Sequence, residues 1–75
     1  MSKYLNIELV KDKMVEHHLS KYRICKISED KELYPVKIQE TNLTKILNGE
    51  RLPTLPTIKT LGMVLNVPFK NLIKD

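Results

Sequence analysis

The fold is decided by one stretch near the middle of the chain, Leu43-Thr44-Lys45-Ile46-Leu47-Asn48-Gly49-Glu50-Arg51-Leu52-Pro53-Thr54. Leu43, Ile46 and Leu47 recur at the spacing of one buried face of an α-helix. Gly49 is expected to end this helix in the left-handed conformation, because glycine adopts that conformation without a steric penalty. Thr54 can then cap a further helix. The stretch therefore predicts two helices joined by a short connection.

Toward the N-terminus, the sequence predicts two more helices. Apolar residues at helical spacing within 7–14 form one stripe. Ser20 is a favourable N-cap for a short second helix, in which Cys25 is expected as a small buried residue. An alternative is that 22–27 forms a strand, which would pair with 33–38 in a hairpin. The Ser20 cap and the flanking helices favour the helix.

Toward the C-terminus, Ile58, Leu61 and Leu65 form the inner face of a fourth helix. Gly62 lies between them, where a second helix can approach closely. Asn66 is expected to end this helix in a left-handed conformation, and a last short helix follows. The five predicted helices cover approximately residues 5–18, 21–28, 40–48, 55–65 and 69–74. The expected fold class is all-α, in a single domain spanning residues 1–75.

Composition and charge limit the function. The chain has 75 residues, of which 41% are hydrophobic and 29% charged, as in an ordinary soluble globular domain. One cysteine cannot form an internal disulfide, which fits a reducing, cytoplasmic setting. The segment Met1–Leu9 has no long apolar run, so no signal peptide is expected. No stretch of the sequence approaches the roughly 20 apolar residues of a membrane span, so no membrane partner is expected. The net charge of +4 favours an anionic partner such as nucleic acid.

Catalytic and metal chemistry are not expected. The sequence offers no nucleophile with a base and an acid, no glycine-rich phosphate loop and no converging carboxylates. His17 and His18 are adjacent, and neighbouring helical residues point about 100° apart, so they make a poor metal pair. We therefore expect a protein that is not an enzyme and that needs no cofactor and no metal.

With these residues in place, the chain resembles the Cro and phage-repressor (XRE-like) helix-turn-helix family. That family's recognition helix ends in an aliphatic and polar pattern followed by Asn-Gly, polar residues, Pro and Ser or Thr, as in 43–54. Residues 57–67 resemble its fourth helix, with Asn66 at the usual glycine. Residues 19–27 resemble the start of its second helix, with Cys25 at the usual alanine. The resemblance extends from about residue 7 to 73 and implies a five-helix lambda-repressor-like DNA-binding domain.

One departure from the family is a lengthened turn between the second and third helices. Leu43 follows Ile24 by 19 positions, more than the family usually has, and the extra residues fall within 29–38. An exposed loop is the simpler interpretation of this insertion. The alternative is that the insertion itself touches DNA or a partner, through Lys31, Tyr34 and Lys37.

The resemblance also implies which residues contact DNA. The third helix would enter the major groove, where Lys45 donates to guanine, Thr41 touches a thymine methyl and Glu40 accepts from a cytosine amine. The expected base-edge contacts are Glu40, Thr41, Asn42 and Lys45. The expected phosphate contacts are Ser20 and Lys21, at the start of the second helix, and Asn48 and Arg51, at the exit of the third.

The function implied is sequence-specific binding of double-stranded DNA by a transcriptional regulator, a repressor of prophage or mobile-element type. We expect a homodimer, or control by a regulatory protein partner. Candidate dimer contacts are the C-terminal residues Phe69, Leu72 and Ile73, or the long loop. The alternative is an antitoxin or adaptor that uses the same fold mainly for protein–protein interaction.

Overall fold

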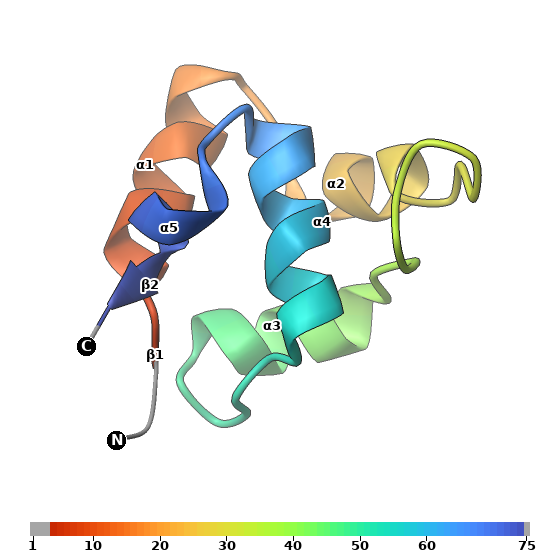
Figure 1. Ribbon diagram of the computed structural model, residues 1–75. Helices are drawn as coiled ribbons and strands as arrows, with labels where there is room; N and C mark the ends of the chain where they lie inside the picture. The colour runs from red at the N-terminus through yellow and green to blue at the C-terminus, as the bar shows by residue number, and fades with distance from the viewer. Residues whose placement is uncertain (1–3, 75) are drawn as a thin grey trace.

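The computed structural model describes residues 4–74 and is built mainly from helices (Figure 1). These are α1 (Ile7–Glu16), α2 (Lys21–Ile27), α3 (Glu40–Leu47), α4 (Leu55–Leu65) and α5 (Phe69–Leu72), with two-residue strands β1 (Tyr4–Leu5) and β2 (Ile73–Lys74). Helix α4 lies in the middle, with α1 and α5 on one side, α2 on the other and α3 across its lower end (Figure 1). The predicted all-α class is confirmed. None of the described helices is long and apolar enough to cross a membrane.

Side-chain caps start the first two helices. The Asn6 side chain accepts from the backbone N–H of Leu9 at 3.2 Å, and Ser20 Oγ accepts from the N–H of Arg23 at 3.2 Å. Residues 22–27 lie in α2, so the alternative of a strand in this segment is wrong. Cys25 is buried, as predicted.

The predicted bounds of the first and the last helix are wrong. Helix α1 begins at Ile7 rather than at residue 5, and it ends before His18, whose left-handed φ of 56° turns the chain toward α2. The last helix stops at Leu72 rather than at residue 74, because the chain there becomes strand β2. Leu5 pairs with Ile73 in an antiparallel register. This pairing joins distant parts of the chain, so local periodicity could not reveal it.

The predicted stop residues are confirmed. Gly49 has a φ of 79° directly after the last turn of α3, and Asn66 ends α4 with a φ of 59°. Gly62 also allows the close approach that its position predicts. A Cβ atom there would lie 2.8 Å from the Val67 carbonyl oxygen and 3.3 Å from Leu72 Cδ1. The chain after α4 therefore folds back directly over this glycine.

The core is aliphatic and lies where α4 meets the other helices. Its buried hydrophobic residues are Leu5, Val10, Ile24, Cys25, Ile38, Leu43, Ile46, Leu47, Ile58, Leu61, Leu65, Val67 and Leu72. Leu72 is 0% exposed, so its candidacy as a dimer contact is wrong. Its side chain belongs to the core, while Phe69 and Ile73 are partly buried against that core.

The insertion between α2 and α3 is anchored at its base. Ser28 Oγ donates to the Cys25 carbonyl at 2.8 Å and accepts from the N–H of Ile38 at 2.9 Å. Farther along, the N–H of Val36 donates to Thr60 Oγ1 on α4 at 3.3 Å. Ile38 is itself a core residue. The expectation of an exposed loop over 29–38 thus applies to the tip, whereas the second half packs onto α4.

Candidate nucleic-acid interface

Helix α3 turns one face into the core and the other to solvent. Leu43, Ile46 and Leu47 are buried, while Thr41 and Lys45 are exposed on the opposite side. This separation follows from the helical period of 3.6 residues, which places the three aliphatic residues on one stripe. Two of the four side chains expected to contact base edges are therefore available to a ligand.

A shallow depression of about 430 Å³ follows the exposed side of α3. It is lined by Glu40, Thr41, Thr44, Lys45 and Glu50. No ion pair joins Lys45 to a carboxylate within residues 4–74. The depression combines one ammonium group with two carboxylates, so its charge is mixed. Glu50 was not singled out from the sequence, although its place directly after the Asn-Gly pair was a usable indication.

Three of the expected DNA contacts, Asn42, Asn48 and Arg51, do not line this depression, and their side chains form hydrogen bonds with other side chains. Arg51 Nη1 donates to Asn42 Oδ1 at 2.7 Å, and Asn48 Nδ2 donates to Glu50 Oε2 at 3.4 Å. These bonds join α3 to the connection that follows it. Arg51 keeps further N–H donors for another acceptor, since a guanidinium group carries five.

Helix α2 carries the clearest concentration of positive charge. Lys21, Arg23 and Lys26 lie on it, and no Asp or Glu occurs between His17 and Ser28. Within residues 4–74, none of these three cations forms an ion pair. Arg23 and Lys26 were missed by sequence reasoning, although the absence of acidic residues from this segment was a sufficient indication.

The expected contacts at the start of α2 occupy a different setting. Ser20 Oγ is already used as the cap of α2. Lys21 is half-buried and lies beside an apolar depression formed with Met14, Val15 and Leu47. The structure thus keeps Lys21 close to the end of α3 without placing it in the depression that Lys45 lines.

The insertion adds little positive charge. Its segment 29–38 holds three carboxylates and two lysines. Lys37 Nζ lies 3.6 Å from Glu29 Oε2, so one of the lysines is already paired. Lys31 is exposed among acidic neighbours, and Tyr34 is half-buried. The insertion is therefore a weak candidate for contact with a polyanion.

Reactive and metal-binding groups are sparse in this region. Burial, with a smaller contribution from Glu40 and Glu29, raises the pKa of the Cys25 thiol above its ordinary value. A thiol held neutral in this way is a poor nucleophile. In the described part of the chain, no group of three or more His, Cys, Asp and Glu side chains is placed to hold a metal ion.

Comparison of the chain with models of known families, with curated proteins and with solved structures finds no match in any of the three.

Proposed function

We propose that the protein binds double-stranded DNA through α3 and α2, as a sequence-specific regulator of transcription of the prophage or mobile-element type. The supporting observation is the presentation of α3. Its inner face is fixed by three buried aliphatic residues, while Thr41 and Lys45 are exposed near α2, whose three cations form no ion pair with any other residue of 4–74. A helix about 10–12 Å across fits a major groove about 12 Å wide.

The proposal divides the contacts into two kinds. Lys45 and Thr41 reach base edges, and Lys45 donates to the two acceptors of guanine. Lys21, Arg23 and Arg51 contact phosphates, which fix the orientation of the helix without reading sequence. The five-helix arrangement is proposed to be lambda-repressor-like, with the anchored insertion as its departure from that fold.

The two carboxylates beside Lys45 give this proposal a specific consequence. Glu40 and Glu50 repel phosphates, so binding to arbitrary duplex is expected to be weak. A base pair that presents a cytosine amine to Glu40 removes that penalty, because the amine donates to the carboxylate. The acidic residues therefore favour discrimination between sequences over general affinity.

The test measures duplex binding by fluorescence anisotropy at about 50 mM salt. One duplex has a random sequence, and the other is taken from upstream of the protein's own gene. We expect tighter binding to the upstream DNA. Lys21→Ala or Arg51→Ala should weaken binding to both duplexes and reduce the salt slope by about 0.9 each. Lys45→Ala should instead change the preference between them.

Lys70→Ala is the matched control, because it removes one positive charge from α5, on the opposite side of α4 from α2 (Figure 1). It should leave both duplexes bound as in the wild type. Absence of any binding at low salt would refute the proposal, and equal effects of Lys45, Lys21 and Arg51 would refute the division of roles.

A second function, that of an antitoxin or adaptor, is favoured by the mixed charge of the α3 depression. Glu40 and Glu50 suit a partner protein better than a polyanion. In this case the chain would form a stable complex with the product of a neighbouring gene. Copurification of the two proteins, together with no duplex binding by the chain alone, would support this function over the first.

A further inference from the structure

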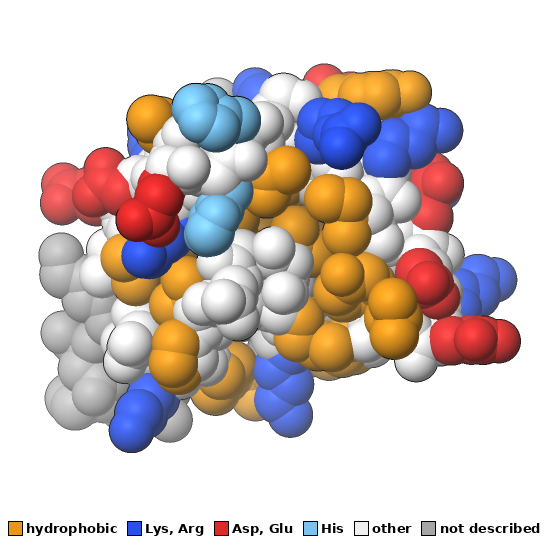
Figure 2. Space-filling model, turned by 90° about the horizontal axis from the view of Figure 1, so that it is seen from above, with side chains coloured by type: hydrophobic (Ala, Val, Ile, Leu, Met, Phe, Trp, Pro, Cys, Tyr) orange, Lys and Arg blue, Asp and Glu red, His pale blue; other side chains and the backbone are white. Residues whose placement is uncertain are grey.

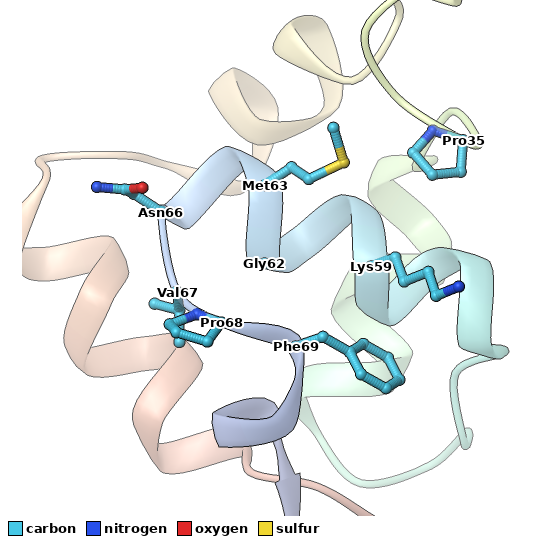
Figure 3. Close-up of a pocket in the computed structure, with 8 residues that line it drawn as sticks. All are labelled: Pro35, Lys59, Gly62, Met63, Asn66, Val67, Pro68 and Phe69. Atoms are coloured by element: carbon cyan, nitrogen blue, oxygen red, sulfur yellow. The ribbon is translucent and has the colours of Figure 1, made fainter.

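An apolar groove lies on α4, away from the α3 depression. It has a volume of about 620 Å³ and is bordered by α4, by the connection to α5 and by the insertion (Figure 3). Met63 and Lys59 project from α4, the ring of Phe69 lies beside Lys59, and Pro35 comes from the insertion (Figure 3). Lys59 Nζ is 5.8 Å from the centre of the Phe69 ring. The groove joins segments that are distant in the sequence.

The groove depends on two anchored features. Gly62 has no side chain, so the Val67 carbonyl closes directly over α4. On the opposite border, Thr60 Oγ1 accepts from the N–H of Val36, the residue next to Pro35. The hydroxyl of Thr60 also donates to the Pro56 carbonyl at 3.0 Å, which fixes its orientation. One border of the groove is therefore held by close backbone packing on Gly62, and the other by the side-chain hydroxyl of Thr60.

The charge around the groove is one-sided. Of the described residues that line it, only Lys59 is charged. No Asp or Glu occurs anywhere in residues 51–74, whereas Lys59 and Lys70 are exposed there. An apolar partner segment that carries carboxylates at its edge is the best match for such a surface.

The insertion of this same chain has that chemistry. Leu33 lies at the tip of the insertion and is 61% exposed. It directly follows Glu32 in the sequence, and Asp30 is three residues before it. Leu33 lies two residues before Pro35, which borders the groove. Seen from above, the molecule has hydrophobic side chains gathered toward the side on which Figure 1 places the insertion, with acidic side chains at that edge (Figure 2). The exposed apolar tip is thus joined to the border of the groove by only two residues of chain.

We propose that two copies of the chain associate through this surface about a two-fold axis. Leu33 of each copy enters the groove of the other, and Glu32 of each copy lies near Lys59 of the other. A surface that carries both a projection and its complementary groove satisfies the symmetry of such a dimer, since each contact occurs twice. The contact is small, so the dimer is weak and its population depends on concentration.

The first test is sedimentation equilibrium of the wild type and of variants at concentrations up to about 1 mM, which spans the range of weak interfaces. Leu33→Asp should weaken dimerisation at least about tenfold, because it places a charge where an apolar side chain is buried. Leu52→Asp is the matched control. Leu52 is 63% exposed and lies outside the groove, so this variant should dimerise like the wild type.

A charge exchange tests the orientation of the two copies. Glu32→Lys and Lys59→Glu should each weaken the homodimer several-fold at low salt. An equimolar mixture of the two variants should form a heterodimer as stable as the wild-type dimer. The heterodimer has two contacts between positions 32 and 59. At one contact both charges are exchanged and still attract, and at the other contact the wild-type Glu32 and Lys59 are both kept.

Three results would overturn the proposal. The first is a wild-type chain that stays monomeric at the highest concentration, and the second is a dimer that Leu52→Asp disrupts but Leu33→Asp does not. The third is a mixture of Glu32→Lys and Lys59→Glu that dimerises no more tightly than either variant alone. The dimer proposal does not rest on DNA binding. Leu33→Asp protein that is monomeric yet still binds a duplex would support both proposals, and a monomeric wild type that binds DNA would refute this one alone.

Discussion

Replacement of Ser28 by alanine removes the hydroxyl that joins the two ends of the insertion. Ser28 and Ile38 are each 1% exposed, and the hydroxyl accepts the N–H of Ile38 at 2.9 Å. In the variant, this N–H has no acceptor and no access to bulk water. Because Ile38 lies just before Gln39 and the start of α3, the loss affects the segment that positions the proposed recognition helix.

The expected cost follows from the burial of this donor. A buried N–H left without a partner destabilises a protein by about 1–3 kcal/mol. A chain of 75 residues has a total stability of about 4–11 kcal/mol, so the change is a large fraction of the whole. Urea denaturation followed by circular dichroism measures the difference in the free energy of unfolding.

Hydrogen exchange of the Ile38 amide supplies the local measurement. In Ser28→Ala this amide should exchange faster than core amides such as that of Leu43, whereas both are protected in the wild type. Ser20→Ala is the control, because it removes an exposed cap at a cost of about 1 kcal/mol and leaves Ile38 bonded. A loss of stability below about 0.5 kcal/mol together with unchanged protection of Ile38 would refute the reasoning.

Three further changes have defined outcomes. Gly62→Ala should lower the free energy of unfolding by about 1–3 kcal/mol, because its Cβ would meet the Val67 carbonyl oxygen at 2.8 Å; an unchanged urea midpoint would contradict this. Glu50→Gln should strengthen duplex binding about two- to fivefold at low salt, because a carboxylate that repels phosphate is removed. Anisotropy titration measures this affinity, and an affinity equal to or weaker than that of the wild type would disprove the prediction. Burial raises the pKa of the Cys25 thiol, so the stability that a neutral thiol contributes is lost as pH rises above its ordinary value of 9.0. In Cys25→Ala, the free energy of unfolding should therefore decline less above this pH than in the wild type. Identical dependence of the free energy of unfolding on pH in the two proteins would rule the effect out.

The elements that local sequence determines were predictable. The helical spacing of Leu43, Ile46 and Leu47 gave the buried face of α3, and Gly49 and Asn66 gave the left-handed ends of α3 and α4. These features need no knowledge of the rest of the chain, because periodicity and backbone preference act over a few residues.

Contacts between distant residues were not predictable. Leu5 pairs with Ile73, and the N–H of Val36 donates to Thr60, 24 positions away. Neither contact has a local pattern, since each depends on how the helices pack. The last predicted helix was consequently too long, and the insertion was expected to be an exposed loop without its anchors.

The candidate site shows the same division. The exposure of Thr41 and Lys45 followed from their helical phase relative to the core residues. The bond between Arg51 and Asn42 did not, because it depends on the path of the chain after α3 and on the rotamers of two long side chains. The position of Glu50 beside Lys45 was indicated only by its place directly after the Asn-Gly pair, because which side chains line the depression depends on the path of the chain there.

The pairing of β1 with β2 has a consequence for the connectivity of the chain. It brings Tyr4 opposite Lys74, and Figure 1 shows both ends of the described chain on the same side of the molecule. A short peptide could bridge them, and a new start could be opened at the exposed tip of the insertion near Lys31. Such a circular permutant would keep all five helices intact, since the order in which the helices follow one another would change while their packing would not.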